Sequence, residues 1–91
     1  MNPKVIKVHP EQNYVLNLWF ANGEQKRFDM KPYLDYEVFQ ALKDQKMFNT
    51  ANIFLGSVTW LNNSDLSYDT LYPEGVPVYN QWSNHFQTGR I

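Results

Sequence analysis

The chain contains no cysteine, so it has no disulfide framework, no thiolate nucleophile and no cysteine-based zinc site. This absence fits a reducing cytoplasm better than a small secreted scaffold, and we expect a cytoplasmic protein. The first residues, "MNPKVIKVHPEQ", lack the apolar core of a signal peptide. No stretch approaches the roughly 18 consecutive apolar residues of a membrane helix, so we expect no membrane contact.

A strong excess of either charge is also missing. Eight Lys and Arg residues face nine Asp and Glu residues, which gives a net charge of −1 and a pI near 6.0. Proteins that bind nucleic acid through its phosphates usually carry a basic face and a high pI. The composition therefore disfavours nucleic-acid binding. A regulator that binds nucleic acid or a small molecule through Lys26, Arg27 and Trp19 is kept as the alternative function.

Signatures of catalysis are missing as well. The sequence has no Gly-x-Ser-x-Gly motif and no Ser-x-x-Lys motif. Its four glycines stand alone, at positions 23, 56, 75 and 89, so no glycine-rich loop can cradle a phosphate. The two histidines, His9 and His85, lie at opposite ends of the chain. We expect a non-enzymatic protein that uses no cofactor and no metal.

Apolar and aromatic side chains are, by contrast, plentiful. Hydrophobic residues make up 43% of the sequence and include six Phe, six Tyr and three Trp, enough apolar area for a folded core. With 91 residues, the chain has room for one domain. We expect residues 1–75 to form that domain and residues 76–91 to form a C-terminal tail.

The clearest local signal is an amphipathic strand. In "NYVLNLWF" (13–20), Tyr14, Leu16, Leu18 and Phe20 share one face, and Trp19 lies on the other. Alternation of this kind is typical of a strand that covers a core with one face. Tyr14, Leu16, Leu18 and Phe20 are therefore core candidates.

Asn22-Gly23 follows this strand and indicates a β-hairpin turn. A two-residue loop would place Leu16 opposite Asp29, whereas a three-residue loop places Leu16 opposite Phe28. A slip of one residue moves every side chain to the other face, so the hydrophobic pattern decides between the two registers. We predict the longer loop, with Gly23 in the left-handed conformation and forming a bulge.

The remaining elements are short. A β-branched strand over 4–10 precedes the hairpin, and 51–61 is typical of two strands about a turn near Gly56. Between them, 31–49 predicts two brief helices, the second capped by Asp44. This order, β-β-β-α-α-β-β, predicts an α+β domain with a small, mostly antiparallel sheet. The core candidates in these segments are Val38, Phe39, Leu42, Met47, Phe48, Ile53, Phe54, Val58 and Trp60.

The tail carries a second aromatic pattern. Tyr79, Trp82 and Phe86 fall at i, i+3 and i+7, a spacing typical of one face of a helix. If they pack on the domain's own sheet, they belong to its core. If they project, they form an apolar patch of the kind that marks a protein interface, and the segment could be exchanged between two copies as a swapped homodimer. Trp19, on the outer face of its strand, is a further interface candidate.

Residues 63–74 place oxygen-bearing side chains at the positions of an EF-hand loop. These side chains are Asn63, Asp65, Ser67, Asp69 and Glu74. Tyr68, however, occupies the position that needs Gly, and Pro73 directly precedes the last ligand. A hydrolase built around Asp65 and Asp69 is a third, weaker hypothesis. We expect the two carboxylates to bond nearby backbone amides as turn and helix caps do. Asn62-Asn63 should turn the chain, and Ser67 or Asp69 should cap a short helical turn that Pro73 and Gly75 end.

Several segments occur in an order that resembles a known family. They are "FANGEQKRFDM", "VFQALKDQKMF" and "VTWLNNSDLSYDTLY". Together they are similar to a bacterial family of small proteins called domain of unknown function 2442, over roughly residues 3–75. The family usually has Gly where this chain has Asn63, and Asn is the next residue best able to adopt a positive φ.

The resemblance implies an α+β domain without an assigned reaction. Some relatives look like this domain fused to a helix-turn-helix module, and others are encoded near a second small protein, as in toxin–antitoxin pairs. Both contexts imply regulation by protein contact. We therefore expect a protein partner, in the form of a toxin–antitoxin-like pair of which this chain is the regulatory half. The expected contact residues are Tyr79, Trp82, Phe86 and Trp19.

Overall fold

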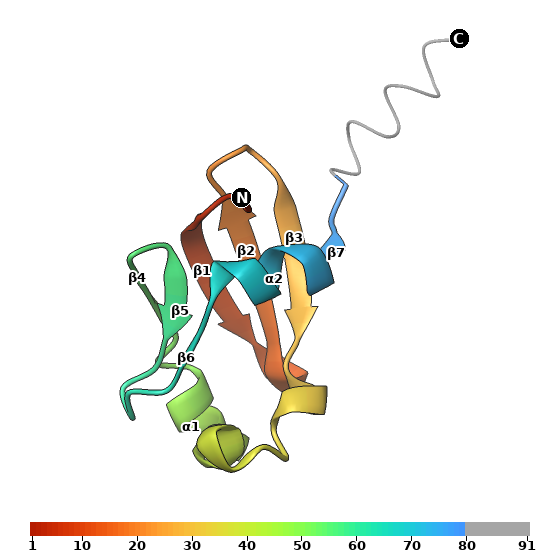
Figure 1. Ribbon diagram of the computed structural model, residues 1–91. Helices are drawn as coiled ribbons and strands as arrows, with labels where there is room; N and C mark the ends of the chain where they lie inside the picture. Colours follow the sequence, from red (N-terminus) through yellow and green to blue (C-terminus); the bar gives the residue numbers. More distant parts are fainter. Residues whose placement is uncertain (80–91) are drawn as a thin grey trace, which may run out of the picture.

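The computed structural model describes residues 1–79, which form two antiparallel sheets joined by short helices (Figure 1). The strands are β1 (Val5–Glu11), β2 (Val15–Phe20), β3 (Gln25–Asp29), β4 (Asn52–Phe54), β5 (Ser57–Thr59), β6 (Asp65–Leu66) and β7 (Val76–Pro77). The helices are η1 (Gln12–Tyr14), η2 (Lys31–Tyr33) and η3 (Glu37–Lys43), which are 3-10 turns, and the α-helices α1 (Gln45–Phe48) and α2 (Tyr68–Glu74). The predicted α+β class is confirmed.

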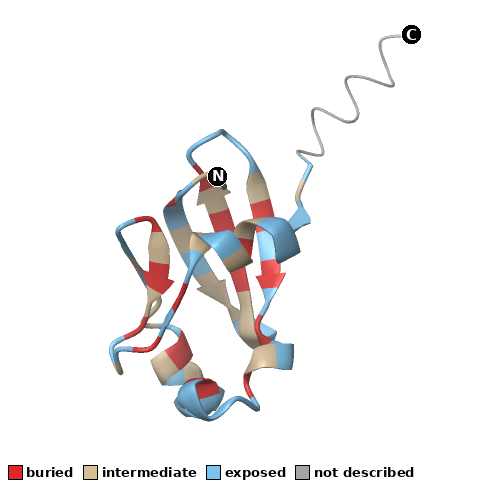
Figure 2. Cartoon of the chain, viewed as in Figure 1, coloured by how far each residue is buried: buried red, intermediate tan, exposed pale blue. Residues whose placement is uncertain are grey.

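The larger sheet has the strand order β1-β2-β3-β7, and the smaller sheet has the order β4-β5-β6. Helix α2 lies across one face of the larger sheet, and the smaller sheet lies beside β1 (Figure 1). The buried residues lie on both sheets and on the helices, and together they form one core (Figure 2). The largest fully buried side chains are Phe20, Phe48, Leu16, Leu18, Met30, Leu42, Leu71 and Val58.

The β2–β3 hairpin has the predicted register. Leu16 lies opposite Phe28, and the loop is closed by the Phe20 amide, which donates to the Glu24 carbonyl at 2.8 Å. The loop therefore has three residues, and Gly23 has a φ of +91°. Burial of Leu16 and Phe28 on the inner face selects this register, because a slip of one residue would place the two side chains on opposite faces of the hairpin.

The expected strand over 13–20 begins two residues later than predicted. Asn13 and Tyr14 have φ values of 64° and 60°, so the chain makes the turn η1 before β2 begins. The register of the hairpin nevertheless continues to Tyr14, because the Met30 amide donates to the Tyr14 carbonyl at 2.9 Å. The Tyr14 ring packs edge-on against Phe48, with the ring centroids 5.4 Å apart.

The second hairpin, β4–β5, turns at Leu55-Gly56 as predicted, with both residues at positive φ. Val58 is buried, as expected. The assignment of Phe54 to the core is wrong, because its side chain is 66% exposed. Phe54 follows Ile53 directly, and neighbouring residues of a strand point to opposite faces.

The helical segment 31–49 contains two 3-10 turns and one short α-helix. Asp44 caps α1 as predicted, with its Oδ1 accepting from the Lys46 amide at 3.0 Å. Phe39 and Leu42 are buried, but Val38 is 60% exposed, so its assignment to the core is wrong. Element η3 has the 3-10 period of about three residues per turn, which aligns Phe39 with Leu42 and leaves Val38 outside their face.

The stretch 60–75 is a turn followed by a capped helix, as expected. Asn63 has a φ of 71°, a left-handed conformation that Asn tolerates better than most residues. Ser67 caps α2 by accepting from the Asp69 amide at 3.0 Å. The expectation that the Asp65 and Asp69 carboxylates bond nearby backbone amides is wrong within residues 1–79, because Ser67 supplies the cap and the Asp69 carboxylate accepts from the side chain of Asn2 at 3.2 Å. Within residues 1–79, no helix is both long enough and apolar enough to cross a membrane.

Candidate functional site

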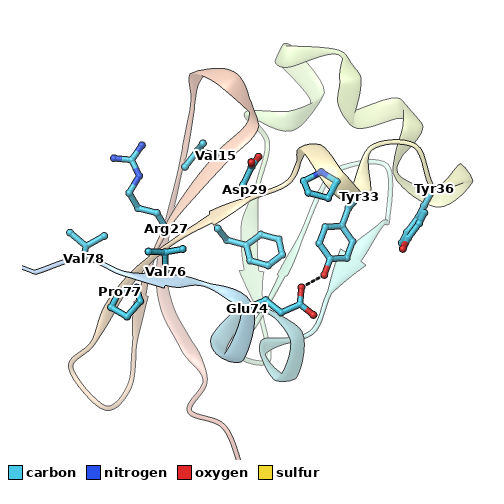
Figure 3. Close-up of a pocket in the computed structure, with 11 residues that line it drawn as sticks. Val15, Arg27, Asp29, Tyr33, Tyr36, Glu74, Val76, Pro77 and Val78 are labelled. Carbon is cyan, nitrogen blue, oxygen red and sulfur yellow. Dashed lines mark hydrogen bonds between the residues drawn. The ribbon is translucent and has the colours of Figure 1, made fainter.

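A groove with a volume of about 610 Å³ lies beside the open edge of the larger sheet (Figure 3). Eleven residues line it, and they come from β2, β3, η2, the end of α2 and β7 with the residue that follows it, together with Tyr36 between η2 and η3. Arg27 and Val78 lie at one end of the groove, and Tyr36 lies at the other (Figure 3). Binding sites for small ligands and side chains typically have volumes of about 300–1,000 Å³.

The groove exists because β7 covers only part of β3. Pro77 pairs with Lys26 and Val76 pairs with Arg27, but Gly75 ends α2 immediately before them. The chain therefore approaches β3 from the helix, and β3 beyond Arg27 has no strand partner on this side within residues 1–79.

The backbone of β3 presents polar groups to this uncovered edge. The Gln25 carbonyl accepts from the Val78 amide at 2.8 Å, so Gln25 directs its backbone groups toward β7. Residues two apart in a strand direct these groups to the same side. Asp29 therefore directs its backbone N–H and C=O toward the groove, beyond the end of β7.

An aromatic wall forms one side of the groove. The ring of Tyr33 lies between Phe28 and Tyr36, with centroid separations of 5.4 Å and 5.7 Å. Phe28 is buried, and Tyr36 is 57% exposed. The wall therefore reaches from the core to the surface, and each ring pair contributes about 0.5–1.5 kcal/mol beyond the area that it buries.

The Tyr33 hydroxyl donates a hydrogen bond to Oε1 of Glu74 (Figure 3). This bond joins η2 to the last turn of α2. The hydrogen bond to Glu74 is the main cause that raises the pKa of Tyr33 to about 12, and burial and the negative charge of Glu74 add to the effect. The phenol therefore stays protonated and continues to donate at neutral pH.

Charged side chains stand on the rim of the groove. Arg27 forms an ion pair with Glu11 at 2.9 Å, and Lys31 forms one with Asp29 at 3.0 Å. Burial raises the pKa of Asp29, but the hydrogen bonds and the charge of Lys31 outweigh it and lower the pKa overall. Within residues 1–79, Glu74 forms no ion pair, so its carboxylate is the rim charge that a basic ligand group could neutralise.

The chemistry of this groove suits a mixed ligand. Aromatic, valine and proline side chains supply apolar walls, Glu74 supplies a negative charge, and Asp29 supplies backbone hydrogen-bonding groups. In the part of the chain that the structure describes, no group of three His, Cys, Asp or Glu side chains is arranged to hold a metal.

The predicted contact residues lie in three places. Tyr79 is 72% exposed and directly follows Val78 at the end of the groove. Trp19 lies on the outer face of the larger sheet, half-buried, with the Lys7 ammonium 4.7 Å from its ring centroid. Trp82 and Phe86, like His85, lie outside the described residues.

The residues chosen for the alternative function do not share a surface. Lys26 is only 7% exposed, and its ammonium donates to the Tyr72 carbonyl at 2.6 Å. The same ammonium lies 3.6 Å from the centroid of the Tyr72 ring. Arg27, the next residue in β3, points to the opposite face, with Trp19. The structure therefore corrects the grouping of Lys26 with Arg27 and Trp19.

The sequence reasoning missed the groove residues Tyr33, Tyr36, Glu74 and Val76. One signal was present, because "KPYLDY" places two tyrosines three residues apart after Pro32. In a 3-10 segment that spacing puts both rings on one side. Nothing near Glu74 in the sequence indicates that it meets Tyr33, which precedes it by 41 residues.

Comparisons with known proteins give one result. The chain matches the family of proteins of unknown function named DUF2442 over residues 5–77, a span that includes β1 through β7. Neither a curated protein nor a solved structure matches the chain. The matched span covers most of the sequence and agrees with the resemblance drawn from its motifs. The chain therefore belongs to the DUF2442 family of proteins of unknown function.

Proposed function

We propose that this domain binds a partner protein through the groove beside β3 and β7. The observation that carries the proposal is the aromatic wall, because it leads from the buried Phe28 to the exposed Tyr36. Tyrosine is enriched among residues that contribute most to protein binding, since it buries a large area with few rotatable bonds. Val76, 66% exposed on the other side of the groove, extends the apolar surface.

The groove favours one kind of partner segment. An apolar or aromatic side chain would be buried between Tyr36 and Val76, and a nearby Lys or Arg would neutralise Glu74. The backbone groups of Asp29 could pair with those of an extended peptide, as when a ligand adds a strand to a sheet edge. We infer a non-enzymatic, cytoplasmic binding protein, and a toxin–antitoxin-like pair with a second small protein is the biological form that we propose.

The experiment is a selection from a peptide library displayed on phage, using the immobilised full-length chain. Binding of the enriched peptides is then measured by fluorescence polarisation for the wild type and for Tyr36→Ala. We expect the dissociation constant to rise about tenfold or more, because truncating a tyrosine that anchors an interface typically costs over about 1.4 kcal/mol.

Two further variants control this experiment. Val76→Thr changes the opposite wall of the groove while keeping a residue that favours strands, and we expect it to weaken binding as well. Phe54→Ser removes an equally exposed apolar side chain from β4, on the far side of the molecule, and should leave binding unchanged (Figure 1). Equal affinity of the wild type and Tyr36→Ala, or no enrichment of any peptide, would contradict the proposal.

A further inference from the structure

We propose that the groove's own ligand is the segment 80–91 of the same chain. This inference rests on the proposed function, since it identifies an occupant for the proposed contact groove. The described chain ends at Tyr79, and the residue before it, Val78, already lines the groove. Segment 80–91 is thus attached beside the surface that it would cover.

The segment is long enough to reach the whole groove. β7 runs from Val76 toward the Arg27 end, so the chain must reverse before it can approach Tyr36. If about four of the twelve residues make this reversal, the other eight can extend over about 26 Å. The residues of β3 and η2 that line the groove run from Arg27 to Tyr33, and six chain steps span at most about 22 Å, which is within that reach.

The composition of the segment complements the groove. Residues 80–91, "NQWSNHFQTGRI", contain Trp82, Phe86 and Ile91 as apolar side chains. The segment has no Asp or Glu, and its basic residues are Arg90 and His85. The groove offers apolar walls and the Glu74 carboxylate, which forms no ion pair within residues 1–79.

Attachment lowers the affinity that occupancy requires. A binding segment on a short linker has an effective concentration in the millimolar range. A segment that binds the groove with a dissociation constant of about 0.1 mM would therefore occupy it for about nine-tenths of the time. Two aromatic side chains that pack against Tyr36 and Val76 are enough for a dissociation constant of about 0.1 mM.

The test uses the absence of native cysteine, which allows one nitroxide label to be attached at a chosen position. Gln87→Cys is labelled in the full-length chain, and NMR signals of the backbone amides are compared with the label paramagnetic and reduced. We expect selective broadening of the amides of Tyr33, Tyr36 and Val76. A labelled Gln87→Cys chain that also carries Trp82→Ala and Phe86→Ala controls for simple tethering. We expect this chain to lose the broadening.

A mixed sample distinguishes the source of the segment. Chains that carry the nitroxide but no ¹⁵N are mixed with ¹⁵N-labelled chains that carry no nitroxide. In this mixture only contacts between two copies can broaden the observed signals. The proposal predicts no broadening in this mixture. Broadening there would show that a second copy supplies the segment, and broadening that persists in the alanine variant would show that tethering alone causes it. Either result overturns the proposal, as does an absence of broadening at the groove.

Peptide binding separates this proposal from the proposed function. If the segment occupies the groove for about nine-tenths of the time, the alanine variant should bind a selected peptide about tenfold more tightly than the wild type. Equal affinities for the wild type and this variant, together with a loss of binding in Tyr36→Ala, would refute the segment as occupant and leave the groove's function intact.

Discussion

The hydroxyl of Tyr33 donates to the carboxylate of Glu74, and this hydrogen bond joins two elements that flank the groove. It holds the Tyr33 ring at the angle at which Phe28 packs on one side and Tyr36 on the other. The shape of the candidate site therefore depends on a contact between η2 and the last turn of α2.

Tyr33→Phe removes this hydrogen bond and keeps the ring. We expect the free energy of unfolding to fall by about 1 kcal/mol, the usual contribution of one such bond. Urea denaturation measures the change. Tyr68→Phe is the matched control, since the Tyr68 hydroxyl donates no hydrogen bond to any of residues 1–79 and its loss should cost less than about 0.5 kcal/mol. Equal effects of the two substitutions would contradict the role given to the Tyr33–Glu74 bond.

The raised pKa of Tyr33 predicts a loss of stability at alkaline pH. The unfolded tyrosine loses its proton near its model value of 10.0, whereas the folded protein holds it until about pH 12. Between these values the unfolded state binds fewer protons, so the free energy of unfolding falls as the pH rises. Denaturation at several pH values should show a steeper fall for the wild type than for Tyr33→Phe. Parallel curves for the two proteins would mean that another group causes the dependence.

The order of the strands and helices up to Thr59 and the register of the first hairpin were predictable from the sequence, whereas the strands β6 and β7 and the division into two sheets were not. Leu16 and Phe28 are both apolar and both flank a turn signal, so burial selects one register. The exposed positions of Val38 and Phe54 were not predicted. Both errors have the same origin. Val38 was grouped with Phe39, and Phe54 with Ile53, although neighbouring residues lie on different faces of a 3-10 turn or a strand.

The groove was less predictable from the sequence than the order of the elements and the hairpin register. Phe28, Tyr33, Glu74 and Val76 come from four separate elements, and only the packing of α2 against β3 brings them together. A pattern within one element identifies which face is buried, but it carries no information on which distant element covers that face. The acidic stretch after Trp60 was correctly expected to contain a capped helix, because caps are local.

Two glycines of positive φ should respond differently to alanine. Gly23 has open space around it, so Gly23→Ala costs only the backbone strain of about 1–2 kcal/mol. A Cβ at Gly56 would lie 2.6 Å from the Cβ of Lys4, so Gly56→Ala adds a clash of about 1–3 kcal/mol. Guanidinium denaturation of both variants tests the order. A smaller loss for Gly56→Ala than for Gly23→Ala would show that β1 and the β4–β5 turn are not packed as described.

Lys26 and Arg27 are neighbours whose removal should have different consequences. Lys26→Met leaves the partly buried Tyr72 carbonyl without its charged donor, and we expect a loss of about 1–3 kcal/mol. Arg27→Met removes an exposed ion pair with Glu11, which is worth less than about 1 kcal/mol. Thermal unfolding of both variants distinguishes them. If Lys26→Met were as stable as the wild type, Lys26 would be available for a ligand, as the alternative function requires.

The location of the binding surface is the central claim, and a chemical-shift map of the full-length chain tests it most directly. ¹⁵N-labelled protein is titrated with a peptide selected on the wild type, and every backbone amide signal is followed. We predict that the largest changes occur at Tyr33, Tyr36 and Val76 around the groove. Changes centred on Trp19 and Gln25 of the outer sheet face, with the groove signals unchanged, would contradict the account.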